Sequence, residues 1–215
     1  MVLYVDEDCP FCTKIIRGES TSAFDLRLAE HRLFVVTPAL GMLVPGYLLL
    51  ISKDHVPSLA RLGPTGLRAI DHWLARHLPG WVTRFGDYFR FEHGMGAGSC
   101  AGACIAHAHL HLIPAEAAVD RIEAALPWQR LASYGTLARL GDRAYAYLGS
   151  RRGHAVVPQP TLPGQWVRRQ TAQALHLDDW DWGAYRGERE LAATLSRRPR
   201  GSARRAVSGT RRARP

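Results

Sequence analysis

Three histidines alternate with small or apolar residues in the segment 105–113, whose sequence is IAHAHLHLI. Side chains alternate between the two faces of a strand, so this segment is predicted to place His107, His109 and His111 on one face, about 6.5–7 Å apart. Each imidazole carries two polar nitrogens that are costly to bury without partners. The pattern therefore favours a functional site over an ordinary core strand. Three solvent-facing histidines and a three-histidine zinc site are the alternatives.

Two cysteines near the N-terminus could present two thiolates to one metal ion. Cys9 and Cys12 form a Cys-x-x-Cys motif, and zinc commonly takes four cysteine and histidine ligands in a tetrahedral array. The sequence opens without the basic start and apolar core of a signal peptide, so a cytoplasmic protein with reduced cysteines is expected. Cys100 and Cys104 precede the three histidines in a glycine-rich loop and are expected to be free thiols. A second metal site or a disulfide is the alternative for that pair.

Apolar patterning and turn residues predict the elements that position these side chains. Strands are expected at 33–37, 47–53, 88–92 and 105–113, with a further pair at 143–148 and 154–157. Helices are expected at 63–77, ended by Pro79-Gly80, and at 117–126, 166–175 and 188–195. The pattern predicts an α+β fold. We expect a catalytic domain over 1–116 with an N-terminal zinc knuckle, a C-terminal extension packed on it over 117–196, and a disordered basic tail over 197–215.

The positive charge of the chain is concentrated at its C-terminus. The formal net charge is +9, and eight arginines between 197 and 215 account for eight of those charges, which leaves +1 for the rest. The net charge therefore does not indicate an anionic partner for the folded part of the chain, although the arginine-rich tail could contact nucleic acid. No stretch has the eighteen or so apolar residues that would span a membrane, so no membrane partner is expected.

The segment 107–113 resembles the signature of the histidine-triad superfamily, His-φ-His-φ-His-φ-φ with φ apolar, at every position. The resemblance runs from about Cys9 to Pro114. It includes the dipeptide 18–19 (GE), the turn 45–46 (PG) and the strand end 51–55 (ISKDH). It implies an antiparallel sheet with flanking helices, and a homodimer formed through the helix and strand that precede the triad.

The resemblance also implies how the histidines divide the chemistry. The middle one, His109, is expected to attack the α-phosphorus of a nucleotide through Nε2, provided that Nδ1 keeps its proton. A covalent nucleotidyl-histidine forms, and water or another acceptor then completes the reaction. His111 is expected to contact a phosphate oxygen or the leaving group. Branches of the family carry a structural zinc ion, for which the matching ligands here are Cys9, Cys12, His55 and His107.

Several positions depart from the pattern of common family members. Tyr47 stands where many relatives have a histidine after the Pro-Gly turn, and Ala39 stands where many have an acidic or amide residue that holds the ribose. The Gly-Gln-Ser/Thr sequence found before the triad is replaced by the segment 102–104 (GAC). These departures predict an altered pocket and a specialised substrate.

Other polar residues are expected to replace the missing contacts. The end of the strand before the triad, the glycine-rich loop and the segment 162–169 (LPGQWVRR) provide them, the last with a weak resemblance to larger family members. Glycine-rich backbone and arginine forks both suit phosphate. The alternatives are incidental hairpin polarity and solvated helix charges. Trp180 and Trp182 are expected to serve packing, with base stacking as the alternative. The candidate substrate-binding residues are Glu92, His93, Gly98, Ser99, Cys104, Gln165, Arg168 and Arg169.

The sequence thus predicts a nucleotide hydrolase or nucleotidyltransferase, with P–N bond cleavage by a phosphoramidase as a variant that shares the first step. The alternative is a zinc-containing protein that binds or processes nucleic acid through the arginine-rich tail. A catalytically inactive binding protein is a third hypothesis, which the complete triad disfavours.

Overall fold

A single antiparallel sheet organises the chain, as the expected α+β class requires. The computed structural model describes residues 4–96 and 105–199. Eight strands lie in the order β1-β2-β3-β5-β4-β7-β8-β6, and all neighbours are antiparallel. The strands are β1 (Ala29–Glu30), β2 (Phe34–Pro38), β3 (Leu48–Ser52), β4 (Phe89–Gly94), β5 (His109–Ile113), β6 (Gln129–Leu131), β7 (Tyr145–Ser150) and β8 (Gly153–Pro158).

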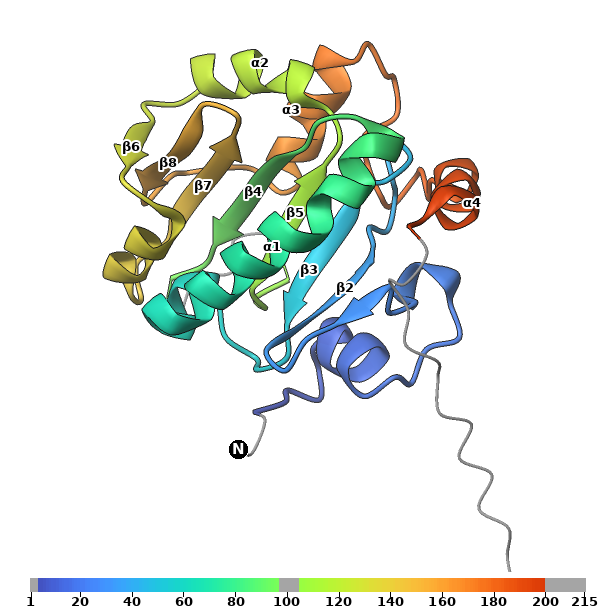
Figure 1. Ribbon diagram of the computed structural model, residues 1–215, viewed down its shortest axis with the longest axis horizontal. Helices are drawn as coiled ribbons and strands as arrows, with labels where there is room; N and C mark the ends of the chain where they lie inside the picture. Colours follow the sequence, from blue (N-terminus) through green and yellow to red (C-terminus); the bar gives the residue numbers. More distant parts are fainter. Residues whose placement is uncertain (1–3, 97–104, 200–215) are drawn as a thin grey trace, which may run out of the picture.

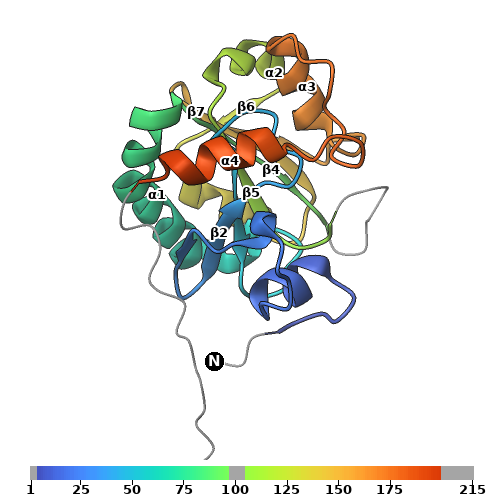
Figure 2. The same ribbon diagram turned by 90° about the vertical axis from the view of Figure 1, so that its right-hand side faces the viewer.

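Helices cover both faces of this sheet. They are α1 (Gly63–Phe85), α2 (Val119–Ala124), α3 (Trp166–Ala174) and α4 (Glu188–Arg197), with a π-helical turn η1 (Phe11–Ile16) and 3-10 turns η2 (Ala23–Asp25), η3 (Leu59–Leu62), η4 (Glu116–Ala118) and η5 (Tyr134–Leu140). Helix α1 runs across the front of β3, β5 and β4 in Figure 1, and the turned view places α2 and α3 on the other side of the sheet (Figure 2).

Strands β2, β3, β5, β7 and β8 contribute alternate residues to two separate apolar cores. On the α1 side, Leu67, Ile70 and Leu74 of the helix join strand residues such as Leu50 and Leu110. The core on the opposite face contains the other strand residues together with the N-terminal segment and α3. This division follows from the two-residue period of a strand. Because of it, the histidines of β5 face away from α1.

Helix α1 extends beyond the predicted stop at Pro79-Gly80 and ends only at Phe85. A proline inside a helix removes one backbone hydrogen bond and costs roughly 3 kcal/mol. Two residues past it the chain buries Trp81, which is 4% exposed, and stacks it on Phe85. Burial of a large aromatic side chain offsets the lost bond. The prediction that the helix ends near His77 was therefore wrong.

The triad strand is shorter than predicted, because β5 begins at His109 rather than at residue 105. The partner strand β3 ends at Ser52, whose N–H donates to the carbonyl of Ala108, so the chain before Ala108 has no further β3 residue to pair with. It turns instead, with the His107 N–H donating to the carbonyl of Ile105 and the Ala108 N–H donating to that of Val56. His107 consequently leaves the strand face that His109 and His111 share.

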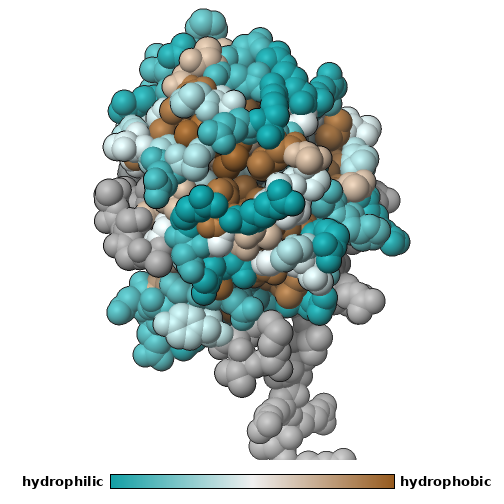
Figure 3. Space-filling view, turned by 90° about the vertical axis from the view of Figure 1, so that its left-hand side faces the viewer, coloured by the Kyte–Doolittle hydropathy of each residue, from teal (hydrophilic) through white to brown (hydrophobic). Residues whose placement is uncertain are grey.

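The C-terminal half of the chain continues the same sheet. Strand β7 pairs with the outer edge of β4 from Arg90 opposite Gly149 to Gly94 opposite Tyr145, and β8 and β6 follow. The 3-10 turn η5 packs beside α1. At the β6 and β8 end of the molecule, brown apolar residues gather within a hydrophilic surround (Figure 3). The predicted strand pair at 143–148 and 154–157 corresponds to β7 and β8.

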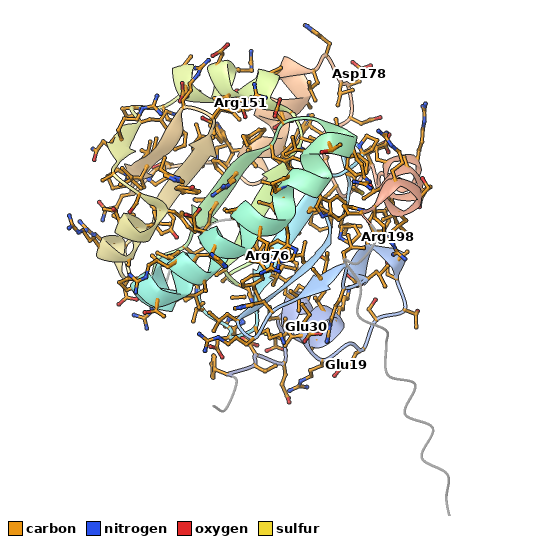
Figure 4. The ribbon with its side chains drawn as sticks, in the orientation of Figure 1. Glu19, Glu30, Arg76, Arg151, Asp178 and Arg198 are labelled. Carbon is orange, nitrogen blue, oxygen red and sulfur yellow. The ribbon has the colours of Figure 1, made fainter. Side chains whose placement is uncertain are left out.

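Charged side chains spread over the outside of the molecule, as the labelled Glu30, Arg76 and Arg151 illustrate (Figure 4). Helix α4 includes Arg197, assigned from sequence to a disordered tail, and its guanidinium lies 4.9 Å from the ring centroid of Phe85. The remaining tail from residue 200, with its expected nucleic-acid contact, lies outside the described residues. Within residues 4–96 and 105–199, no helix has the length and apolar character needed to cross a bilayer.

Candidate active site

A pocket of about 250 Å³ lies on the sheet face opposite α1. Its floor carries His109 and His111 from β5 and His93 from β4. The knuckle, which we define as residues 9–16, forms one wall. A second wall, which we call the C-terminal wall, comes from residues 162–168 together with Trp182. The knuckle contributes Pro10, Phe11, Lys14 and Ile15, and the C-terminal wall contributes Leu162, Pro163, Gln165, Trp166, Val167, Arg168 and Trp182.

His109 is held in the tautomer that a nucleophile needs. Its Nδ1 lies 2.7 Å from the carbonyl oxygen of His107. A carbonyl only accepts, so Nδ1 carries the proton and Nε2 keeps its lone pair. Burial lowers the pKa of His109 below the ordinary histidine value, which favours the neutral ring. The edge of Phe11 packs against this ring, with the two centroids 5.3 Å apart.

His111 is oriented by Tyr47, whose hydroxyl lies 2.7 Å from His111 Nδ1. Burial raises the pKa of Tyr47 to about 12, so the phenol keeps its proton. The Arg168 guanidinium, 5.9 Å from the Tyr47 ring centroid, offers only donors. We infer that the Tyr47 O–H donates to Nδ1, because this arrangement leaves the phenol oxygen free to accept on the side of Arg168. This leaves the His111 proton on Nε2, and burial holds the pKa of His111 well below its usual value.

Arg168 brings a buried positive charge to the pocket. It is 4% exposed, and its guanidinium donates to the carbonyls of Trp180 at 2.9 Å and Gly41 at 2.5 Å. The carbonyl contacts fix the guanidinium without neutralising it. A fixed cation beside the triad histidines suits an anionic substrate.

The four predicted metal ligands converge on one point beside the pocket. The ligand atoms of Cys9, Cys12, His55 and His107 all lie within 4.8 Å of one another. Cys9 Sγ is 3.4 Å and Cys12 Sγ 3.5 Å from His107 Nδ1, and Cys12 Sγ is 3.4 Å from His55 Nδ1. Two sulfurs and two imidazole nitrogens are a donor set that zinc takes in tetrahedral geometry.

Local structure supports this donor set. His107 donates from Nε2 to the carbonyl of Ser52 at 2.7 Å, which leaves Nδ1 to coordinate and fixes the ring. Burial raises the pKa of Cys12 to about 11, so a thiolate at this depth requires a nearby cation. The Arg27 guanidinium donates to the carbonyls of Ile15 and Ile16 and so closes the C-terminal end of η1. The residues present thus fit a zinc ion.

The structure brings only some of the expected substrate-binding residues to the pocket. His93, Gln165 and Arg168 line it with the triad histidines. Glu92 lies on the other face of the sheet, where its carboxylate accepts from the Leu59 N–H and the Tyr145 hydroxyl, each at 2.7 Å. The reason is the two-residue strand period, which sends Glu92 away from its neighbour His93. It does not reach the pocket.

The remaining expected residues lie elsewhere. Arg169 is exposed and its guanidinium lies 4.4 Å from the ring centroid of Trp180, so it faces away from the pocket. Gly98, Ser99 and Cys104 lie outside the described residues, as does Cys100.

Sequence reasoning overlooked two residues of the pocket floor. Tyr47 was counted as the loss of a histidine, whereas its hydroxyl holds His111. Thr37 lines the pocket, is fully buried, and has a hydroxyl with no hydrogen-bond partner among the described residues. Thr37 pairs with Leu49, and Leu49 pairs with His111, so all three lie in one row across the sheet. Pairing the strands on either side of the Pro-Gly turn would have placed Thr37 in that row.

Comparison with known proteins supplies one relative by sequence. No protein-family model matches the chain. It is 33% identical over 110 residues to a protein from Arabidopsis thaliana named adenylylsulfatase HINT3, a match that covers 51% of this chain and 53% of the relative. The chain thus spans about half the length of this curated relative.

Among solved structures, the chain is similar to a Hit-like protein involved in cell-cycle regulation from Bartonella henselae. That likeness has a TM-score of 0.40 and 18% identity, and covers 51% of this chain and 78% of that one. It is also similar to a galt-like protein from Arabidopsis thaliana, with a TM-score of 0.42, 14% identity, and coverage of 75% and 86%. At these TM-scores the likeness carries no weight for function.

Three findings agree with the resemblance seen in the sequence. They are the full triad signature, the tautomers assigned to His109 and His111, and the sequence relative. These features make the chain similar to proteins of the histidine-triad superfamily.

Proposed function

We propose that this protein cleaves a nucleotide at its α-phosphate through a covalent intermediate on His109. The observation that carries the proposal is the 2.7 Å bond from His109 Nδ1 to the His107 carbonyl, because it frees Nε2 inside a pocket that also holds the Arg168 cation. The name of the Arabidopsis relative, an adenylylsulfatase, favours an adenylyl group as the group transferred.

In the first step, the Nε2 lone pair of His109 forms an N–P bond while the bond from phosphorus to the leaving group breaks. The bonding pair departs with the leaving group. Nε2–H of His111 donates to a phosphate oxygen or to the leaving group, and the Arg168 charge opposes the negative charge of the phosphate. Both histidines start neutral, which their lowered pKa values favour.

In the second step, water attacks phosphorus, the N–P bond breaks, and its electron pair returns to His109 Nε2. The products are a nucleoside monophosphate and a proton released to solvent. Replacing water by a sugar phosphate makes the same enzyme a nucleotidyltransferase, and a nitrogen leaving group makes it a phosphoramidase. Zn²⁺ held by Cys9, Cys12, His55 and His107 would supply structural cross-linking only.

Trapping the intermediate tests this mechanism. The protein is mixed with adenosine 5′-phosphosulfate, adenosine 5′-phosphoramidate or ATP, quenched early and examined by mass spectrometry. We expect an adenylyl group on the peptide that contains His109, and its loss in His109→Ala. His176→Ala, which changes an exposed histidine after α3, is the matched control and should retain the adduct. Parental turnover by His109→Ala, or an adduct on another residue, would overturn the proposal, as would neither adduct nor turnover with any of the three compounds.

A further inference from the structure

A tryptophan in the C-terminal wall is exposed where a core residue was expected. Trp182 lines the pocket, yet 37% of it remains accessible, which places it among the most exposed large apolar residues described. Its neighbour Trp180 differs, because it does not line the pocket and its ring lies against the Arg169 guanidinium. An exposed indole at the wall of a pocket is a surface on which a flat ring can stack.

The contacts between the nucleophile and Trp182 form a continuous series. The ring centroids of His109 and His111 are 4.9 Å apart, and His111 contacts the Tyr47 hydroxyl at 2.7 Å. The Arg168 guanidinium follows, 5.9 Å from the Tyr47 ring. Arg168 and Trp182 then meet at Gly41, since a Cβ on Gly41 would lie 2.9 Å from the guanidinium and 2.6 Å from Trp182 Cβ. These contacts link Trp182 to His109 through His111, Tyr47 and Arg168.

Gln165 holds Trp182 in this place. Its Nε2 donates to Asp181 Oδ1 at 2.8 Å, and its Oε1 accepts the Trp182 backbone N–H at 3.0 Å. Both polar atoms of the amide are therefore committed to one loop. Gln165 also adopts the left-handed conformation, with φ 61° and ψ 22°, which costs a non-glycine residue on the order of 1 kcal/mol.

We propose that Trp182 is the platform on which the nucleobase of the substrate stacks, and that Gln165 is the positioning residue that fixes it. The inference rests on the proposed function, because a phosphate at His109 leaves the base to occupy another part of the same pocket. Leu40, next to Gly41 in the chain, also lines the pocket and adds apolar surface near Trp182. Stacking does not depend on base identity, so this platform recognises the nucleoside class and not one base.

Equilibrium binding of 5′-AMP and of ribose 5-phosphate to the intact protein tests the platform. AMP is a reaction product, so no turnover intervenes, and ribose 5-phosphate lacks only the base. We expect Trp182→Ala to weaken AMP binding about ten-fold, which corresponds to about 1.4 kcal/mol, with ribose 5-phosphate unchanged. Trp182→Phe should restore most of the AMP affinity, and Trp180→Ala is the matched control that should bind as the parent does.

Three results would overturn the inference. The first is that Trp182→Ala binds AMP as tightly as the parent does. The second is that Trp182→Ala loses as much affinity for ribose 5-phosphate as for AMP, which would indicate a distorted pocket and not a lost stacking surface. The third is that the parent binds neither AMP nor any of the other three nucleoside monophosphates. Trapping separates this inference from the proposed function. If an adduct forms on His109 but Trp182→Ala binds AMP as the parent does, only the stacking inference fails. If Trp182→Ala loses affinity for AMP but not for ribose 5-phosphate and no adduct forms, only the mechanism fails.

The role of Gln165 has its own test. Gln165→Gly relieves the left-handed strain but removes both loop contacts, so thermal stability should change little while the ratio of AMP to ribose 5-phosphate affinity falls several-fold. Gln159→Gly is the control, because Gln159 is also left-handed, with φ 48°, and lies outside the pocket. It should leave the ratio unchanged. An unaltered ratio in Gln165→Gly would show that Gln165 does not position the platform.

Discussion

A single hydroxyl decides which nitrogen of His111 carries the proton. Relatives expected to have a histidine at position 47 would offer either a donor or an acceptor there, whereas protonated Tyr47 beside Arg168 donates to Nδ1. His111 is thereby kept as an Nε2–H donor. The substitution that looked like a lost contact in the sequence is an alternative way of fixing the same tautomer.

Tyr47→Phe tests this assignment. The variant removes the O–H donor and leaves a buried Nδ1 without a partner, which costs about 1–3 kcal/mol of stability. We expect kcat to fall by about ten-fold while KM changes less, because His111 would then populate both tautomers. Kinetics and the ¹⁵N chemical shifts of His111 measure the two effects. Parental kcat with an unchanged ¹⁵N spectrum would contradict the assignment.

Glu92 illustrates a buried titratable group that serves stability and not chemistry. Burial raises its pKa from 4.5 to about 8. The folded protein keeps this proton up to about pH 8, whereas the unfolded chain releases it near pH 4.5. Between those values the unfolded state binds fewer protons, so the Glu92 contribution to the free energy of unfolding falls as pH rises.

Glu92→Gln should remove that dependence. The stability of the variant relative to the parent is expected to increase from pH 5 to pH 8, while kcat and KM stay unchanged because Glu92 lies across the sheet from the pocket. Urea unfolding midpoints at the two pH values, together with steady-state kinetics, measure both. A relative stability that is flat with pH, or a raised KM, would refute this reading.

At the scale of elements, local patterns predicted what local interactions determine. Alternating apolar residues and turn signals located β2, β3, β7 and β8, since those strands pair with close neighbours in the chain. Two element ends depended on distant partners. Burial of Trp81 carries α1 past Pro79, and the end of β3 at Ser52 leaves residues 105–107 without a β3 partner.

The same limit applies to the pocket. The family resemblance implied that Cys9, Cys12, His55 and His107 lie together, and the structure brings them together. The role of His109 as nucleophile stays a prediction. The C-terminal wall was not predicted, since nothing local indicates that Trp182 lies against Gly41. Gly41 has a φ of 69° and lies in a tight turn. The residue that fills the space beside it, Trp182, is 141 positions further along the chain.

The knuckle connects metal binding to the shape of the pocket. Phe11 lies between Cys9 and Cys12 of the candidate zinc site in sequence. Its ring contacts the rings of both His107 and His109, at 5.7 and 5.3 Å between centroids. We expect purified protein to contain about one zinc per chain. Removing it with a chelator, or replacing Cys12 by Ser, should accelerate hydrogen exchange in residues 5–20 and 105–109 and weaken AMP binding.

The control for Cys12→Ser is Thr13→Ser, which introduces serine at the neighbouring residue of the knuckle without changing a candidate metal ligand. It should keep its zinc and its exchange pattern. A zinc content near zero in the active parent protein would show that the protein does not need the metal. Unchanged exchange after zinc is lost would show instead that the knuckle folds without it.

At the scale of the whole molecule, the second half of the chain covers the surface through which family members are expected to dimerise. The strand that precedes the triad is β4, and β7 occupies its outer edge along five residue pairs. The preceding helix α1 packs beside η5. The pocket likewise obtains both walls from the same chain.

We therefore predict that this chain does not form the homodimer that the family resemblance implied. Light scattering coupled to size-exclusion chromatography at micromolar concentration should give the mass of one chain, 23.9 kDa. Activity per chain should not depend on dilution. A stable dimer whose dissociation follows substitutions on β4 or α1 would contradict the prediction.

The pairing of β7 with β4 also constrains how this protein can be shortened. A fragment that stops near residue 116 would leave the backbone N–H and C=O groups of β4 facing water, and such an open rim recruits a second fragment or initiates aggregation. The fragment would keep every histidine of the triad yet lack Gln165, Arg168 and Trp182. Minimal versions made for crystallography or library screening would thus differ from the parent in both assembly and ligand range.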